Sequence, residues 1–308
     1  MPRAARKKTL KSIFHVCGRS ISEVLLFKDD DDKLKFISFI KKFQNLYKFR
    51  VYGYCLMDNH FHLIIDANGV DISSIMHSIN HSYALYFNKI HHRHGHLFQD
   101  RFKSKIVNDN AYLFNLSAYI HNNATDLPLY ENCPEKYIFS SLGVYLGLRH
   151  DPFEMVEEDF VMSLFGKDVE TARKNYIEFV YACDDKKFKE EIEFQNEKTE
   201  YRSERKILVR NNNEDEVVEF VSSKMDVPKA KLYAKKCRNT VNAKAMVVIL
   251  MRSLCNYKCK TICGLLGNIT QSRVSALSSI GISLLDTDEE FRNIFEDFIK
   301  SYALKKIS

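Results

Sequence analysis

The chain has 308 residues, of which 45% are hydrophobic and 28% are charged. The length predicts about two domains, and the composition is typical of a folded globular protein and excludes wholesale disorder. The net charge of +6 divides into +8 over residues 1–125, −8 over residues 126–198 and +6 over residues 199–308. Basic blocks suggest polyanionic partners, although charge alone favours an unevenly charged solvated surface.

The first block alternates strand-like and helix-like patterns. Short runs rich in β-branched and aromatic residues predict strands at residues 12–17, 51–57, 61–65 and 102–107. Apolar residues at helical spacing predict helices at residues 34–46, after an acidic start at 29–32, and at 72–90 and 110–123. The order β-α-β-β-α-β with one added helix predicts an α+β fold of the ferredoxin-like arrangement.

The rest of the chain has a helical pattern. Three prolines and two acidic helical stretches predict a connector after the first block. Beyond it, helices are predicted at residues 214–224, 241–254, 259–266 and 271–279. Gly267-Asn268 separates the last two, which is the outline of a helix-turn-helix in an all-α domain. The predicted domains are therefore residues 1–148, the acidic connector 149–199, and 200–308.

His60-Phe61-His62 is the most informative triplet in the sequence. In a strand, residues i and i+2 point to the same face, so both imidazoles would project together while Phe61 turns into the core. Two converging neutral imidazoles are a natural start for a divalent metal site. Histidines on an exposed strand are the alternative, but the strongly apolar strands on either side favour metal ligation.

Tyr119 and Asn123 form a second constellation, because residues i and i+4 of a helix share a face. A tyrosine hydroxyl with a pKa of about 10 is a poor nucleophile near neutral pH. A nearby metal compensates by polarising the electrophile and stabilising the leaving oxygen. The amide oxygen of Asn123 would complete the metal shell. The alternative is a half-buried helix aromatic, and the chain has 16 tyrosines.

The stretch from His91 to Lys105 combines four histidines and several permanent cations with Phe98. Basic residues interleaved with an aromatic side chain are typical of a groove for single-stranded nucleic acid, and a hydrated loop is the alternative. The cations that we predict to contact DNA are Arg93, Arg101, Lys103 and Lys105.

The 8 cysteines are scattered along the chain. This spacing argues against a disulfide framework and for a reducing cytosol. Cys255, Cys259 and Cys263 recur along one helix stripe with no histidine nearby, so we expect three small buried hydrophobes and not a metal cluster. No apolar run reaches the roughly 18 residues that a membrane span needs, and no apolar region follows the basic start as in a secretory signal.

Three motifs in order give this sequence a resemblance to the single-tyrosine HUH transposases. The branch that it resembles most is the REP-associated tyrosine transposase-like proteins of bacteria, over about residues 2–147. The motifs lie at residues 54–65, 95–104 and 118–123, with a trailing match at 137–141.

The resemblance implies a specific chemistry. His60 and His62 would bind Mg²⁺ or Mn²⁺ with Asn123 as third ligand, and Tyr119 would be the nucleophile. Such enzymes cut single-stranded DNA, often beside a hairpin, form a 5′-phosphotyrosine link and rejoin strands by the reverse attack. One departure is Asn123-Ala124, where the family usually has Asn-Pro. It removes no ligand.

Residues from about 200 to 285 resemble the DNA-binding domain of the bacterial replication initiator DnaA. The matching segments are residues 245–254, 261–267 and 272–277. The resemblance would direct the helix that begins at Gln271, Ser272 and Arg273 toward a major groove of duplex DNA, with Arg238 and Lys244 near the backbone. A helical bundle that only packs is the alternative.

The leading hypothesis is a metal-dependent endonuclease and strand transferase acting on single-stranded or hairpin DNA. Duplex DNA would be a further partner of the C-terminal domain. The alternative is a domesticated, non-catalytic DNA-binding regulator that keeps the HUH fold. Either function predicts a cytoplasmic, nucleoid-associated protein, and neither fixes the oligomeric state.

Overall fold

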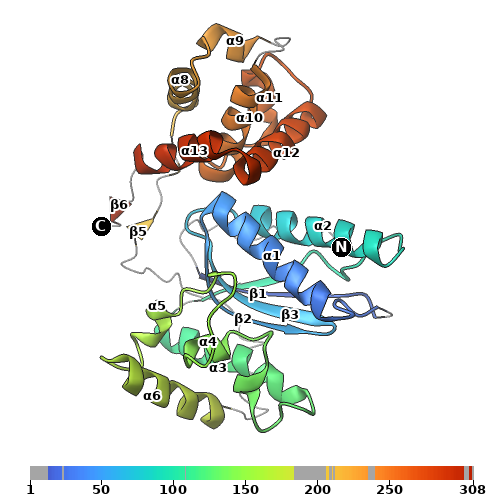
Figure 1. Cartoon of the computed structure of the whole chain (residues 1–308), viewed down its shortest axis with the longest axis vertical. Coiled ribbons are helices and arrows are strands. Elements are labelled where there is room, and N and C mark those ends of the chain that lie inside the picture. The colour runs from blue at the N-terminus through green and yellow to red at the C-terminus, as the bar shows by residue number, and fades with distance from the viewer. Residues whose placement is uncertain are drawn as a thin grey trace. The chain divides into compact units, whose positions relative to one another are not determined.

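Figure 1 shows the computed structural model of the chain, which describes residues 13–22, 24–107, 109–183, 206–207, 210, 212–234, 240–301 and 305–306. Contacts between residues divide it into unit 1, Met1–Ser203, and unit 2, Glu204–Ser308.

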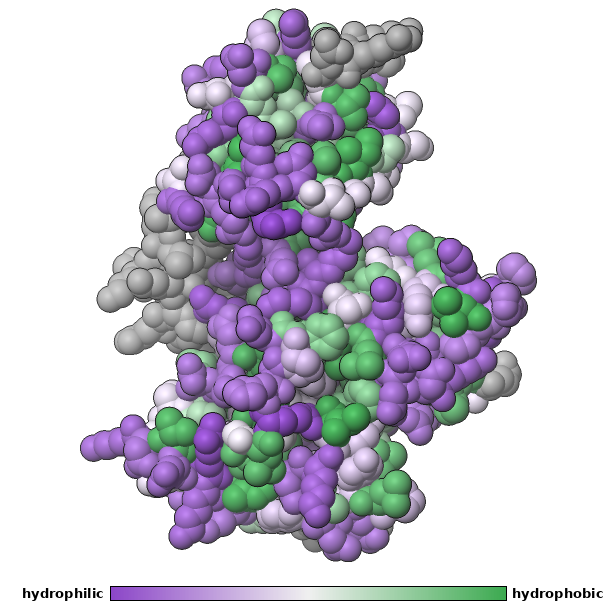
Figure 2. Space-filling model, in the orientation of Figure 1, coloured by the Kyte–Doolittle hydropathy of each residue, from purple (hydrophilic) through white to green (hydrophobic). Residues whose placement is uncertain are grey.

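Within the described residues, none of the helices is both long enough and apolar enough to cross a membrane. Figure 2 shows a mostly hydrophilic visible surface with scattered apolar spots.

Unit 1 is built on a four-stranded sheet. Its strands are β1 (Ile13–Arg19), β2 (Arg50–Met57), β3 (His60–Asp66) and β4 (Lys103–Ile106). Their order in the sheet is β2-β3-β1-β4, and every neighbouring pair is antiparallel. The main helices are α1 (Asp30–Tyr47), α2 (Ile72–Ile90) and α3 (Asn110–Asn122). The predicted α+β class is confirmed, and β1 runs two residues further than predicted.

Helices cover both faces of this sheet. In Figure 1, α1 and α2 lie over one face, and α3 lies over the other together with the segments that follow it. Phe61 is completely buried, with its ring 4.8 Å from that of Phe36 in α1. The cross-strand partner of Phe61 is Gly18, where an added Cβ would lie 2.5 Å from the Phe61 ring. Glycine at this position therefore lets Phe61 fill the core, and the residues on either side of Phe61 face the opposite way.

The helix starts follow ordinary capping chemistry. The Asp29 carboxylate accepts a hydrogen bond from the Asp32 amide at the start of α1, as the acidic run predicted. Asp109 does the same for the Tyr112 amide at the start of α3. The helix that carries Tyr119 therefore begins at a defined residue.

The middle segment packs on unit 1 directly. Its short elements are η1 (Asn123–Asp126), η2 (Pro134–Lys136), α4 (Leu142–Tyr145), α5 (Asp159–Met162) and α6 (Val169–Ala182). The Glu157 amide donates to the Val51 carbonyl over 2.8 Å, and α6 packs against α3. The part of the predicted connector that the structure describes therefore belongs to unit 1, and the domain boundary at 148 stays a prediction. The remainder, up to residue 199, lies outside the described residues.

Unit 2 is mainly helical. Its helices are α8 (Glu214–Lys224), α9 (Lys229–Tyr233), α10 (Val241–Ile249), η4 (Leu250–Leu254), α11 (Cys259–Leu265), α12 (Gln271–Thr287) and α13 (Glu289–Ser301), and a short pair is formed by β5 (Lys206–Ile207) and β6 (Lys305–Lys306). The buried helix α10 packs against α12, where a Cβ on Gly281 would lie 2.6 Å from Ile249.

The predicted pair of helices with a short turn is present in unit 2. Gly267 and Asn268 form the turn with φ angles of 81° and 56°, and α11 packs against α12. The helix α12 continues eight residues beyond the predicted end at 279. The prediction of three buried cysteines is right for Cys255 but wrong for Cys259 and Cys263, which are half-buried because α11 lies near the surface.

Candidate metal and nucleophile site

A partly open pocket gathers the residues that the sequence singled out. It lies on the sheet face opposite Phe61, between the strand ends and α3. The pocket is lined by His60, His62, Tyr119 and Asn123, together with Lys103 and Lys105 of β4. Residues from the hairpin, from β4 and from α3 therefore meet at one place, although up to 63 positions separate them in the sequence.

Strand alternation brings the two histidines together. The ring centroids of His60 and His62 are 5.1 Å apart, and Phe61 between them points into the core. His62 is buried, whereas His60 is half-buried. The shared face follows from the period of two residues in a strand.

The Nδ1 atom of each imidazole is hydrogen-bonded to a neighbouring side chain. His60 Nδ1 lies 2.6 Å from Asn59 Oδ1, and His62 Nδ1 lies 2.9 Å from His15 Nε2. An amide oxygen only accepts, so His60 carries its proton on Nδ1. The remaining nitrogen, Nε2, is then the atom that could ligate a metal.

Burial keeps the deeper histidines neutral. It lowers the pKa of His62 well below its usual value, with further lowering from His15 and His60. Burial and then Lys105 lower the pKa of His15 to about 3. A neutral imidazole keeps a lone pair for a metal, whereas a protonated one does not.

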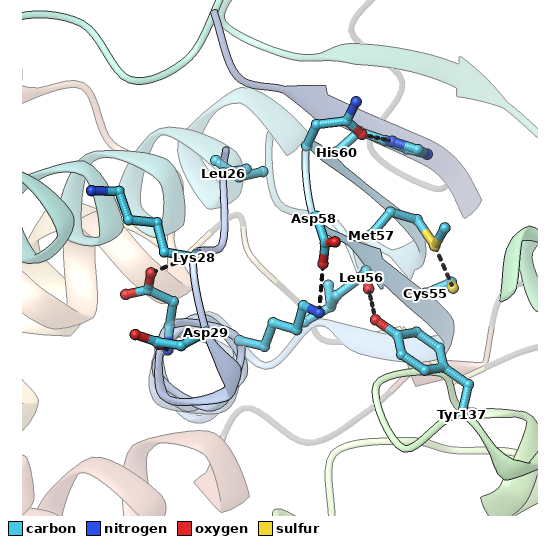
Figure 3. A network of polar contacts seen from close by, with 12 residues as sticks. Leu26, Lys28, Asp29, Cys55, Leu56, Met57, Asp58, His60 and Tyr137 are labelled. Atoms are coloured by element: carbon cyan, nitrogen blue, oxygen red, sulfur yellow. Dashed lines mark hydrogen bonds and ion pairs between the residues drawn. The ribbon is translucent and has the colours of Figure 1, made fainter. Parts of the chain in front are cut away.

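Hydrogen bonds from other segments of the chain hold the turn that carries Asn59 and His60 (Figure 3). Asp58 accepts a 2.8 Å charge-assisted hydrogen bond from Lys33 Nζ of α1, and its carbonyl accepts from the Phe27 amide. The Asn59 carbonyl accepts from the Ser20 amide just after β1. The hairpin tip is therefore held to α1 and to the neighbouring strand.

Tyr119 and Asn123 enter the pocket from α3 and its end. The Tyr119 ring is 5.3 Å from the His62 ring in an edge-on arrangement, and its side chain is buried. Asn123 begins η1 one residue after the end of α3 and keeps helical angles. Its Nδ2 donates to the Tyr119 carbonyl over 2.7 Å, which leaves Oδ1 as its candidate ligand atom.

Only part of the predicted cationic set lies at this pocket. Lys103 and Lys105 line it, whereas Arg101 is exposed outside its lining. Arg93 lies at the end of α2, where its guanidinium donates to Asn88 and stacks 5.8 Å over Phe87. The predicted DNA contact of Arg93 therefore falls away from the pocket.

Three further side chains line the pocket, all from β1, and the sequence pattern did not single them out: His15, Cys17 and Arg19. Arg19 stands opposite His60 in the sheet, and Cys17 stands opposite His62. Their alternation in the first strand was the available signal. The predicted strand ends at Cys17 and therefore leaves out Arg19.

A separate cluster lies between α1 and the end of α2. Ligand atoms of Asp29, Asp32 and His91 lie within 4.8 Å of one another. The buried Asp32 accepts from the Lys28 amide and pairs with His91 over 2.9 Å. None of the three residues lines the pocket. The hydrogen bonds among them join α1 to the end of α2, and this structural role already accounts for their proximity.

The helix that carries Tyr119 is anchored by a buried histidine. His121 Nδ1 lies 2.6 Å from the Tyr176 hydroxyl of α6, and Nε2 lies 2.7 Å from Ser141 Oγ. Ser141 Oγ accepts in turn from the Tyr54 amide of β2. The acidic middle segment thus fixes α3 to the sheet, a role that its composition did not indicate.

Acid is expected to destabilise unit 1 through His121. Burial and then Arg149 lower its pKa to about 3 from 6.5, so the unfolded chain takes up this proton at a higher pH than the folded protein. The contribution to stability is complete above about pH 6.5 and is lost toward pH 3, at about 1.4 kcal/mol per pH unit. In urea unfolding, the free energy of unfolding of His121→Asn should fall less steeply than that of wild type between about pH 6 and pH 4.

His81 is exposed, and His81→Asn is the matched control. Its free energy of unfolding should change with pH as steeply as that of wild type. Comparing slopes separates the proton effect from any loss of packing that the substitution causes at every pH. A His121→Asn slope equal to that of wild type would contradict the assignment.

The motif-bearing part of the chain matches a known family. Residues 9–123 match the model of the family described as Transposase IS200 like, and this range contains His60, His62, Tyr119 and Asn123. This segment is therefore similar to the IS200-like transposases. The similarity supports an enzyme of the transposase class.

A solved structure also matches, the structure of a REP-associated tyrosine transposase bound to a REP hairpin. The TM-score is 0.41 at 14% sequence identity, over 50% of this chain and 90% of that chain. None of the curated proteins compared matches the sequence.

The IS200-like match ends before unit 2, where the remaining predicted DNA contacts fall. Gln271, Ser272 and Arg273 are exposed in the first turn of α12. Lys244 is buried, and its Nζ donates to the Ala234 carbonyl, so its predicted contact with the DNA backbone stays a prediction. Arg238 lies outside the described residues.

Proposed function

We propose that this IS200-like transposase cuts and rejoins single-stranded DNA with Tyr119 as a covalent nucleophile. The observation that carries the proposal is the convergence of His60, His62, Tyr119 and Asn123 on one pocket lined by cations. The strand order β2-β3-β1-β4 around the β-α-β-β-α-β elements supports the ferredoxin-like arrangement as the scaffold for this site.

The residues fit a divalent cation. His60 and His62 would each present Nε2, since Nδ1 of each ring is hydrogen-bonded, and Asn123 would present Oδ1. Imidazole and amide oxygen ligands suit Mn²⁺, and Mg²⁺ accepts such a site when water and phosphate oxygens supply the other positions. When bound, the cation neutralises charge on the scissile phosphate.

The cleavage step follows from the position of Tyr119. Its hydroxyl oxygen attacks the phosphorus and forms an O–P bond while the bond to the 3′ oxygen breaks. The phenolic proton leaves to solvent, and the released oxygen takes up a proton as a 3′-OH. Attack of a 3′-OH on the phosphotyrosine reverses the exchange, so the bond is conserved for rejoining.

The substrate class is DNA with a single-stranded segment beside a hairpin. Arg19, Lys103 and Lys105 would hold its phosphates, because all three line the pocket. Covalent trapping tests the proposal. A labelled hairpin with a single-stranded flank is incubated with the protein and Mn²⁺ and then denatured, and a protein–DNA adduct is expected.

Unit 2 would add a contact to duplex DNA through the first turn of α12. Thr270 caps this helix by accepting from the Arg273 amide, and Gln271, Ser272 and Arg273 present polar side chains at its exposed start. This is the end of a recognition helix that contacts bases in helix-turn-helix proteins.

Replacing Arg273 with Ala is expected to weaken duplex binding about tenfold, since one DNA-contacting arginine is worth roughly 1–3 kcal/mol. The change should leave cleavage of single strands intact, as should truncation before Tyr201. Lys300→Ala in α13 is the matched control, because this cation is 77% exposed in the same unit. Equal duplex affinity for Arg273→Ala and wild type across a salt series would refute the contact.

A further inference from the structure

The buried imidazole of His15 touches the site without belonging to the proposed ligand set. Its Nε2 lies 2.9 Å from His62 Nδ1, and the two rings stack with centroids 5.2 Å apart. The Tyr119 ring lies edge-on 6.0 Å away. We propose that His15 is a positioning residue for the metal site: its Nε2 accepts a hydrogen bond from His62 Nδ1–H and so keeps His62 Nε2 as a lone-pair donor. This inference rests on the proposed function.

The hydrogen bond between the two rings holds one proton, and its direction decides what His62 can do. If His15 donates from Nε2, then His62 carries its own proton on Nε2, and that atom cannot bind a cation. If His62 donates from Nδ1, its Nε2 lone pair is free of a proton. Metal binding at Nε2 is therefore compatible with only one direction of this bond.

His60 shows the same arrangement with a different partner. Asn59 Oδ1 can only accept, so it fixes the Nδ1 proton of His60. His15 would fix the Nδ1 proton of the buried ligand, His62, as Asn59 fixes that of the half-buried ligand, His60. Each of the two proposed imidazole ligands thus has a hydrogen-bond partner at Nδ1, the adjacent Asn59 for His60 and His15 of β1 for His62.

Packing restricts the His15 ring to this role. His15 stands between Ile64 of β3 and Lys105 of β4 in the sheet and is 7% exposed. The stacked His62 ring and the edge of Tyr119 bound its movement within the pocket. Metal-binding histidines ordinarily have such a partner, and its loss lowers metal affinity by about 10- to 100-fold.

Mn²⁺ binding to the full chain without DNA tests the inference, read by electron paramagnetic resonance. His15→Phe keeps a ring but has no acceptor, and we expect its Mn²⁺ affinity to fall at least about tenfold. His15→Gln places an amide oxygen near the position of Nε2 and should restore affinity to within about threefold of wild type. Circular dichroism of each variant checks that it is folded.

The wild-type protein supplies a second readout that needs no variant. Long-range ¹H–¹⁵N spectra of the Mg²⁺-saturated protein should show His62 protonated on Nδ1 and not on Nε2. A His62 ring protonated on Nε2 in that state would overturn the inference, and so would unchanged Mn²⁺ affinity in folded His15→Phe.

His62→Ala separates this inference from the proposed function. If His62→Ala binds Mn²⁺ as tightly as wild type, the metal site itself is wrong. If His62→Ala loses Mn²⁺ while His15→Phe keeps it, the metal site stands and only the role of His15 falls.

Discussion

Replacing Tyr119 with Phe is expected to abolish the covalent protein–DNA adduct and to lower strand cleavage by at least about 10³-fold. The change removes only the hydroxyl oxygen that would attack the phosphate, and it keeps the ring that packs 5.3 Å from His62. Hairpin binding should therefore stay close to that of wild type. The measurement is denaturing electrophoresis of labelled hairpin DNA with a single-stranded flank after incubation with Mn²⁺.

Tyr112→Phe is the matched control for this experiment. Tyr112 lies on the same helix, α3, but does not line the pocket, so its variant should form the adduct as wild type does. An adduct that survives Tyr119→Phe would assign the nucleophile to another residue. No adduct with wild type across many hairpins would favour the non-catalytic DNA-binding regulator.

Replacing His60 or His62 with Ala should remove cleavage and adduct formation, each by at least about 100-fold, while hairpin affinity changes by less than about threefold. The two effects should separate because the imidazoles would hold the metal ion, whereas the basic side chains on β1 and β4 would contact the phosphates and set most of the affinity. Cleavage is followed on labelled DNA, and binding is measured by gel shift in the absence of metal.

Two control variants test whether the histidine effect is specific to the pocket and separate from DNA binding. His94→Ala removes an exposed histidine outside the pocket lining and should cleave as wild type does. A double change of Lys103 and Lys105 to Ala should weaken hairpin binding and flatten its salt dependence. Equal losses of binding and cleavage in the His60 and His62 variants would indicate that these residues support the fold and not the chemistry.

Local periodicity in the sequence determined much of this protein. The helices at residues 72–90 and 214–224 have the predicted bounds, since long apolar patterns at a period of 3.6 fix a helix and its buried face. His60 and His62 share a face because a strand repeats every two residues. Tyr119 and Asn123 share a face because residues i and i+4 of a helix lie one turn apart.

The tertiary structure alone decided which segments meet. His15 and His62 are 47 positions apart, and the pairing of β1 with β3 places them in contact. Lys244 looks like a surface cation in the sequence, but helix packing in unit 2 buries it. The anchor of α3 through Tyr176 likewise depends on how α6 folds back. Periodicity is a local property, whereas strand register and helix packing are set by how the whole apolar surface is buried.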